Sequence, residues 1–162
     1  MAVDVPSREQ VDRVVDEAAS QLGGLHILVN SASLPGGSPS AVGPIATLDE
    51  DELLSDFDVK YVGALRCARA AIPYLKEQGW GRIINISSIY GREYGGSIDY
   101  MTGKAALIAF SKHMALNLVK ENVLVNCIAP GSIDFPGSSW DRFQQNSTPE
   151  EVAEFIDRNL PA

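Results

Sequence analysis

The fold of this chain is decided by one segment, Gly81-Arg82-Ile83-Ile84-Asn85-Ile86-Ser87-Ser88. Its centre is a short apolar run, and two serines follow the run directly. Leu25–Val29 and Val123–Ile128 are similar apolar runs before and after it in the chain. Short continuous apolar runs are typical of strands that are buried on both faces of a parallel sheet. We therefore expect three such strands, and we expect residues 1–5 to be the end of another.

Helical patterns separate the three runs. Apolar residues recur at helical spacing over Ser7–Leu22, Thr47–Gln78 and Ser97–Lys120, and Pro149 begins a last helix. Ser7 and Thr47 each precede a Gln or Glu by three residues, which is the spacing of an N-terminal capping box. Strands that alternate with helices predict an α/β fold with a parallel sheet.

Ligands of open α/β sheets bind beyond the carboxyl ends of the strands. Asn30, Ser88 and Pro130-Gly131 each follow one of the three apolar runs, and Asp4 follows the segment at the N-terminus. We therefore expect these residues to share one edge of the sheet.

The composition is that of an ordinary globular domain. The chain has 162 residues, of which 45% are hydrophobic and 21% charged, and this allows one domain with a core. A net charge of −8 without a basic run argues against binding to nucleic acid. No apolar run reaches the length of a membrane span and no signal-peptide core is evident, so we expect a soluble, cytoplasmic protein. Cys67 and Cys127 stand alone in apolar surroundings, which favours buried thiols and no metal site.

Tyr100 and Lys104 stand near the beginning of the helical pattern at 97–120, as Tyr-x-x-x-Lys. Four residues of helix return to the same face, so the phenol and the ammonium group are held close together. A nearby cation favours the phenolate form of a tyrosine, and such a phenol can exchange a proton with a carbonyl or alcohol oxygen. The alternative is a surface lysine beside a packed tyrosine, because this spacing also arises by chance.

Several motifs, in order along the chain, resemble those of the short-chain dehydrogenase/reductase family, and the resemblance covers nearly the whole chain. The motifs are Asp4-Val5, Asn30-Ser31-Ala32-Ser33, the segment 81–88, Tyr100 with Lys104, Asn126, and Pro130-Gly131-Ser132-Ile133. The resemblance implies hydride transfer between a nicotinamide cofactor, NAD or NADP, and a carbonyl or alcohol substrate. An activity like that of a 3-oxoacyl reductase, or a related one, would fit it.

By this resemblance, three residues are catalytic. Tyr100 would be the general acid in reduction and the base in oxidation, Lys104 would favour its phenolate form and bind the ribose hydroxyls, and Ser88 would hydrogen-bond the substrate oxygen. Ser87 is the alternative to Ser88. The cofactor would be bound by Tyr100 and Lys104 together with Asp4, Val5, Asn30, Ala32, Ile86, Pro130, Gly131 and Ile133.

Lys60 stands where the family has an asparagine that supports a proton relay. A charged lysine cannot accept hydrogen bonds, so this departure puts the relay in doubt. The simpler alternative is a lysine that only extends its ammonium group to solvent.

The resemblance begins at the family's third strand and leaves out the Gly-rich turn that holds the pyrophosphate. We expect one domain over residues 1–162, a partial Rossmann-like, doubly wound parallel sheet that lacks the first βαβ unit and the last strand. Right-handed crossovers place the helices at 7–22, 47–78 and 97–120 on one face of the sheet. The other face would expose apolar side chains, and the edge at 25–29 would lack a partner, so we expect the chain to aggregate or to associate.

Three functions remain open at this point. The first is an NAD(P)-dependent oxidoreductase that acts on a small carbonyl or alcohol and forms a homo-oligomer through the helices at 47–78 and 97–120. The second is a catalytically inactive fragment that acts only as an association module. The third is a lyase or epimerase that reuses the same residues, although Ser88 and the Pro130-Gly131 turn favour the dehydrogenase.

Overall fold

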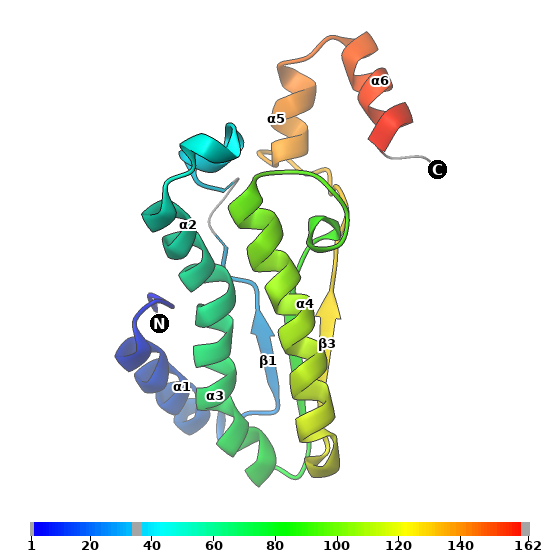
Figure 1. Cartoon of the computed structure of the whole chain (residues 1–162). Coiled ribbons are helices and arrows are strands. Elements are labelled where there is room, and N and C mark those ends of the chain that lie inside the picture. The colour runs from blue at the N-terminus through cyan, green and yellow to red at the C-terminus, as the bar shows by residue number, and fades with distance from the viewer. Residues whose placement is uncertain (1, 34–36, 160–162) are drawn as a thin grey trace. The chain divides into compact units, whose positions relative to one another are not determined.

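The computed structural model describes residues 2–33 and 37–159 (Figure 1). Met1, part of the expected surface loop (34–36) and the terminal residues 160–162 lie outside the described residues. The chain forms two compact units, Met1–Ala129 and Pro130–Ala162.

A three-stranded parallel sheet forms the centre of the first unit. Its strands are β1 (Ile27–Asn30), β2 (Gly81–Ile86) and β3 (Val123–Ile128), in the order β1-β2-β3. Ile84 of β2 lies opposite Val29 of β1 and Asn126 of β3, so these three side chains share one face of the sheet. The expected α/β fold with a parallel sheet is confirmed.

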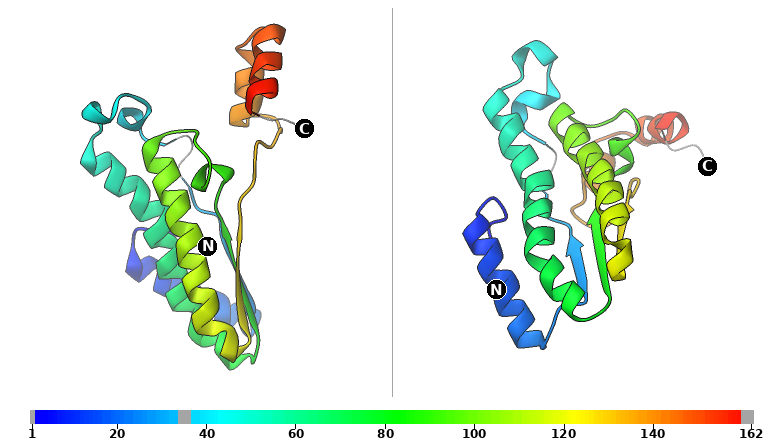
Figure 2. Two further views of the ribbon diagram at one scale, coloured as in Figure 1. Left: turned by 45° about the vertical axis from the view of Figure 1, so that its right-hand side comes forward. Right: turned by 60° about the horizontal axis from the view of Figure 1, so that its bottom comes forward.

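The main helices of the first unit pack on one face of the sheet, as the right-handed crossovers predict (Figures 1 and 2). They are α1 (Arg8–Leu22), α2 (Glu50–Phe57), α3 (Gly63–Glu77) and α4 (Ile98–Leu118). Between this layer and the sheet lies the core, with Leu75, Ile83 and Val123 completely buried. On the opposite face, Ile27, Val29, Leu124 and Ile128 stay exposed.

The helix ends follow local side-chain chemistry. Ser7 caps α1, because its Oγ accepts a hydrogen bond from the backbone N–H of Gln10 at 3.4 Å, and Gly23 ends the helix with φ of 71°. The predicted capping box at Thr47 is wrong. Asp49 caps α2 instead, since its carboxylate accepts hydrogen bonds from the backbone N–H groups of Asp51 and Glu52.

Residues 2–5 form no strand, which corrects the expectation for the N-terminus. A strand is held by the hydrogen bonds of its neighbour, and the described sheet consists of β1, β2 and β3 alone. Val5 packs instead against α3, where a side chain added at Gly63 would meet its Cγ2 at 2.9 Å.

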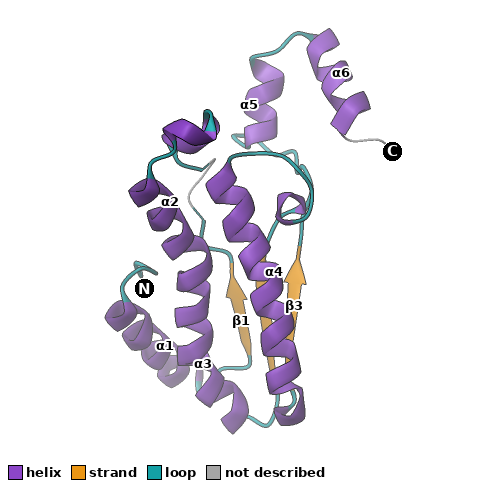
Figure 3. Ribbon diagram, viewed as in Figure 1, coloured by secondary structure: helices purple, strands orange, loops and turns teal. Residues whose placement is uncertain are grey.

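The long helix expected over 47–78 consists of three pieces, which follow one another as continuous helix in Figure 3. A π-helical turn, Asp58–Val62, separates α2 from α3. Such turns add one residue to a helix and are frequent at functional sites. Here the turn carries Lys60, whose side chain is completely buried.

The second unit holds two short helices, α5 (Ser139–Gln145) and α6 (Pro149–Asn159). Pro149 is the first residue of α6, as predicted, and Thr148 and Glu151 form a reciprocal capping box before it. The rings of Trp140, Phe143 and Phe155 lie 5.0–5.4 Å apart and make the small apolar cluster that holds the two helices together.

Candidate active site

Tyr100 and Lys104 lie in the first two turns of α4, at the end of β2. The Nζ atom of Lys104 is 5.6 Å from the centre of the Tyr100 ring. It also donates a hydrogen bond of 2.8 Å to the carbonyl oxygen of Ile86, the last residue of β2. The phenol and the ammonium group are therefore close, and the strand end fixes the position of the ammonium group.

The ammonium group of Lys104 lies in surroundings that disfavour its charge. Burial lowers the pKa of Lys104 below its usual value of 10.5, and the positive charge of Lys60 lowers it further. Negative charges, that of Asp56 among them, act in the opposite direction. The site thus holds a lysine that gives up its proton more readily than a lysine in water.

Lys60 approaches the same tyrosine from another helix. Its Nζ atom lies 5.3 Å from the centre of the Tyr100 ring and forms a buried ion pair with Asp56. Gly103 of α4 makes room for it, since a Cβ at that position would lie 3.3 Å from Cδ of Lys60. The alternative in which Lys60 extends to solvent is therefore wrong, because its buried side chain lies between α2 and α4.

The two serines after β2 have different surroundings. Ser87 Oγ donates a hydrogen bond of 2.7 Å to the backbone oxygen of Lys104. Ser88 caps the short turn Ile89–Gly91, with its Oγ accepting from the N–H of Tyr90 at 3.2 Å. The hydroxyl proton of Ser87 is thus committed to the backbone, whereas the described contact of Ser88 uses a lone pair and leaves its proton as a donor.

Asp99 is a buried residue of the site that sequence reasoning missed. Its carboxylate accepts hydrogen bonds from the backbone N–H and Oγ of Ser38, both at 2.6 Å, and from the N–H of Tyr100 at 2.7 Å. Burial raises the pKa of Asp99, but the hydrogen bonds that its carboxylate accepts together outweigh burial and hold the pKa below 3.8. Asp99 therefore joins the segment at Ser38 to the beginning of α4. Its position directly before Tyr100 was the available signal.

Asn30 lies at the end of β1 and its side chain points into the helix layer. Its Nδ2 donates to Oδ1 of Asn85 at 2.8 Å, and Nδ2 of Asn85 donates to Oγ of Ser111 at 2.8 Å. All three residues are buried. This row of polar groups ties β1, β2 and α4 together beneath Tyr100 and Lys104.

The other residues expected at the cofactor lie in two places. Asp4 and Ala32 are exposed in the first unit, and the backbone oxygen of Val5 accepts a hydrogen bond from Arg66 at 3.3 Å. Pro130, Gly131 and Ile133 belong to the second unit, where Ile133 is exposed.

A family model described as short chain dehydrogenase matches residues 1–147. The chain belongs to the short-chain dehydrogenase family. The matched residues 1–147 include Ser88, Tyr100 and Lys104, which are among the residues that carry the resemblance in the sequence.

Two curated relatives illustrate the similarity within the short-chain dehydrogenase family. The chain is 32% identical to 4-formylbenzenesulfonate dehydrogenase of Comamonas testosteroni, over 98% of this chain and 61% of the relative. It is 35% identical to 3-oxoacyl-[acyl-carrier-protein] reductase of Aquifex aeolicus, over 79% of this chain and 50% of the relative. The chain therefore spans between half and two thirds of the length of these relatives.

Solved structures agree with the fold of this short-chain dehydrogenase chain. NAD⁺-bound xylitol dehydrogenase superposes with a TM-score of 0.79 at 30% identity, over 88% of this chain and 54% of that one. Within residues 2–33 and 37–159, no group of His, Cys, Asp and Glu side chains is suited to hold a metal ion. No helix in that part of the chain is long and apolar enough to cross a membrane.

Proposed function

We propose that this chain carries the acid–base part of an NAD(P)-dependent oxidoreductase of the short-chain dehydrogenase family, a cytoplasmic protein that acts on a small carbonyl or alcohol. The nicotinamide would supply or accept the hydride. The names of the relatives suggest three reactions, which are reduction of a 3-oxoacyl group, oxidation of an aldehyde and oxidation of a small alcohol.

Tyr100 would exchange the proton with the substrate oxygen. Support comes from the buried ammonium group of Lys104, 5.6 Å from the Tyr100 ring and held by the oxygen of Ile86. A cation in a low-dielectric position stabilises a phenolate, so the proton can leave and return at moderate cost. This arrangement of Tyr100 and Lys104 is the observation that carries the proposal.

Ser88 would orient the substrate oxygen by donating its hydroxyl proton. The described partner of Ser88 is a backbone N–H, which occupies an oxygen lone pair. Ser87, by contrast, directs its proton to a backbone carbonyl. This difference favours Ser88 over Ser87 for the role.

The residues present fit a nicotinamide nucleotide in part. An ammonium group has three donors, and one donor of Lys104 is directed at Ile86, so ribose hydroxyls could take the others. Asp4, Val5 and Ala32 would lie along the cofactor in the first unit. Pro130, Gly131 and Ile133 would meet the nicotinamide, and this part of the proposal rests on the family resemblance alone.

Titration of the purified chain with NADH and with NADPH, followed by cofactor fluorescence, tests the proposal. Binding of one cofactor, weakened in K104M and kept in K112M, supports it. K112M is a matched control because Lys112 is an exposed lysine of the same helix. Absence of binding of both cofactors at millimolar concentration would remove the enzymatic function for this chain.

The second candidate, an association module without catalysis, is favoured by the exposed apolar face of the sheet. Ile27, Val29 and Ile128 are about half exposed there, and apolar patches of this kind commonly bind other proteins. Association through the outer surfaces of α3 and α4 would instead fit a homo-oligomer of the family type. Charge substitutions on the sheet face (I27K/I128K) and on α4 (L116K) separate these two surfaces.

A further inference from the structure

Asp56 is a buried carboxylate that is only half satisfied. The residue is 1% exposed, and Oδ1 forms the ion pair with Lys60. Oδ2 is also buried and has no hydrogen-bond partner. A buried oxygen with negative charge and no donor is costly and needs an explanation.

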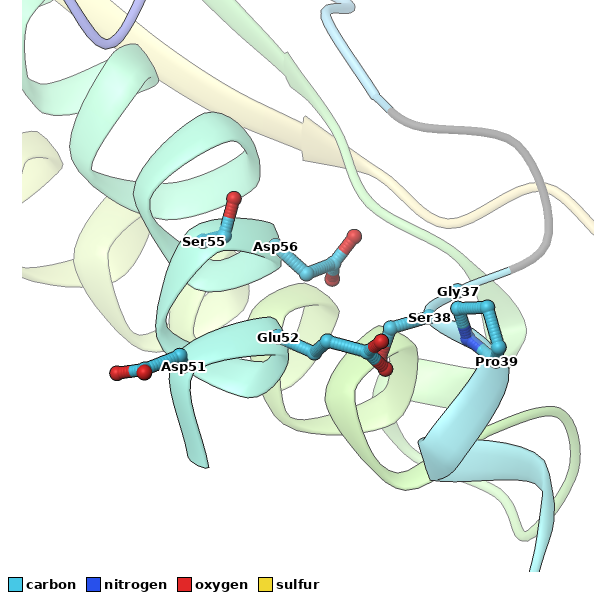
Figure 4. A pocket seen from close by; sticks show the side chains of 7 residues that line it. All are labelled: Gly37, Ser38, Pro39, Asp51, Glu52, Ser55 and Asp56. Atoms are coloured by element: carbon cyan, nitrogen blue, oxygen red, sulfur yellow. The ribbon is translucent and has the colours of Figure 1, made fainter. Parts of the chain in front are cut away.

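The explanation lies in the pocket beside it. A cavity of about 440 Å³ is lined by Gly37, Ser38, Pro39, Asp51, Glu52, Ser55 and Asp56. Figure 4 shows Glu52 and Asp56 extending from α2 toward the Gly37–Pro39 segment, whereas Asp51 points away from it. The unsatisfied carboxylate thus belongs to a side chain that lines an accessible space.

Helix electrostatics account for the other acidic residues of α2, but not for Asp56. Glu50, Asp51 and Glu52 lie in the first turn of α2, where negative charge is stabilised by the helix dipole. Asp56 lies one turn further along, where α2 continues into the π-turn without a free helix end, so the dipole at the N-terminus does not account for its charge. Its charge is offset by Lys60, but that ion pair occupies one oxygen only.

We propose that this pocket binds a small organic ammonium ion, with Oδ2 of Asp56 as its principal acceptor. The site goes beyond the proposed hydride transfer, and it requires no nicotinamide cofactor.

The lining offers what an ammonium ion needs. Such an ion has N–H donors that point in several directions. Asp56 and Glu52 provide carboxylate acceptors, and Ser55 provides a hydroxyl from the same helix. One oxygen of Glu52 accepts from the N–H of Ser40 at 3.0 Å, which fixes this carboxylate in place. Asp51, Glu52 and Asp56 give the lining three carboxylates, and the positive charges of Lys60 and Lys104 act on Asp56 from its other side.

An organic cation fits better than a metal ion or a large molecule. Divalent hard cations need six or more oxygen ligands in a defined geometry, and the described residues contain no acidic or His/Cys group suited to a metal. The volume lies at the lower end of the range for small-molecule sites, about 300–1,000 Å³. An amine with a short polar chain would leave room for water along Ser38 and Pro39.

The first experiment uses three salts on the whole chain. Ethanolammonium chloride is the probe, tetramethylammonium chloride has the same charge without N–H donors, and potassium chloride is the control for an adventitious ion only. We expect ethanolammonium to raise the melting temperature in a saturable way and to shift the amide NMR signals of Ser38 and Glu52. Equal effects of the three salts, or no saturable effect of ethanolammonium, would overturn the proposal.

Variants of the ion pair give a second, independent readout. Lys60→Met removes a competing cation and releases Oδ1 of Asp56, so ethanolammonium should bind roughly tenfold more tightly. The double variant K60M/D56N removes both charges and avoids an unpaired buried lysine. We expect it to lose binding while it keeps its fold.

Glu50→Gln is the matched control, since it removes a carboxylate from the same helix outside the pocket lining. Its affinity for ethanolammonium should stay within about twofold of the wild type. Weaker binding in K60M, or equal losses in E50Q and K60M/D56N, would contradict the assignment of Asp56. Because the experiments contain no nicotinamide cofactor, their failure is distinguishable from failure of the proposed oxidoreductase function.

Discussion

The two faces of the three-stranded sheet are built by the same strands but meet different surroundings. On the face toward α3 and α4, Ile83 is completely buried, and Oδ1 and Nδ2 of Asn85 each have a buried hydrogen-bond partner. On the other face, Ile27 is 57% and Ile128 48% exposed. Both faces are apolar in sequence. The composition of a strand therefore predicts that both of its faces should be buried, but it does not show whether other elements bury them.

The face of the sheet opposite α3 and α4, with Ile27, Val29, Leu124 and Ile128 exposed, is called the bare face. The largest effect is expected on association through it. If a second chain covers this face, the double variant I27K/I128K loses about 1.5–3 kcal/mol for each isoleucine that the contact buries. We expect the wild type to form oligomers or aggregates and the variant to shift toward monomer, measured by size-exclusion chromatography with light scattering.

Leu116→Lys is the matched control for that experiment. Leu116 is 74% exposed on α4, away from the bare face. If L116K disperses the oligomer and I27K/I128K does not, the helices form the contact. A wild-type chain that is a monomer with a sharp thermal transition would contradict association through either surface.

Neighbouring isoleucines of β2 compare the faces within one strand. Ile83 points to the helices and is completely buried, whereas Ile84 points to the bare face and is partly exposed. Ile83→Ala should lower the free energy of unfolding by about 2–5 kcal/mol, and I84A by less than half of that, measured by urea denaturation. Equal losses would indicate that a partner covers Ile84 in solution.

Two asparagines on adjacent strands extend the comparison to polar groups. Asn85→Ala leaves the side chains of Asn30 and Ser111 without their buried partner, so a loss of about 1–3 kcal/mol is expected. Asn126 is exposed on the bare face, and N126A should change the free energy of unfolding by less than about 0.5 kcal/mol. A larger loss in N126A than in N85A would reverse the assignment of the two faces.

The smallest effect concerns Asp99, which belongs to the covered face. The hydrogen bonds that its carboxylate accepts together hold the pKa of Asp99 below 3.8 against the effect of burial, so the ionised form stabilises the fold above that pH. The wild type should have a higher free energy of unfolding than D99N. This difference should be largest at neutral pH and should become smaller as the pH falls below 3.8. Thermal unfolding of both proteins between pH 7 and pH 3 measures this difference. A difference that increases on acidification would contradict the role of this carboxylate.

Periodicity predicted the repeating parts of the fold well. The three strands and the helices that begin near Ser7, Ser97 and Pro149 agree with the structure, because burial imposes a regular pattern on each element. The predictions were wrong where a single local contact determines how an element begins or whether it forms. Asp49 replaced Thr47 as the cap of α2, and the N-terminal residues formed no strand because the described sheet gives them no neighbour.

The candidate site was predictable as far as motifs reach. The spacing of Tyr100 and Lys104 predicted that their side chains lie close together, as they do in the structure. Asp99 and Asp56 were missed, since an acidic residue on a helix is usually exposed and no pattern marks a buried one. Asp56 stands four residues before Lys60, and this spacing was the one available sign of their ion pair.

The sequence by itself determined the α/β class, the parallel sheet and the pairing of a phenol with an ammonium group, because each follows from local spacing, and its motifs carried the resemblance to the family. Only the tertiary structure decided that a second lysine, Lys60, reaches Tyr100, that Asp56 is buried with one oxygen unpaired, and that one face of the sheet stays bare. These features depend on a π-turn, on the space beside Gly103 and on which helices are present. The burial of a charge is a property of packing between elements, and no single segment of the chain contains it.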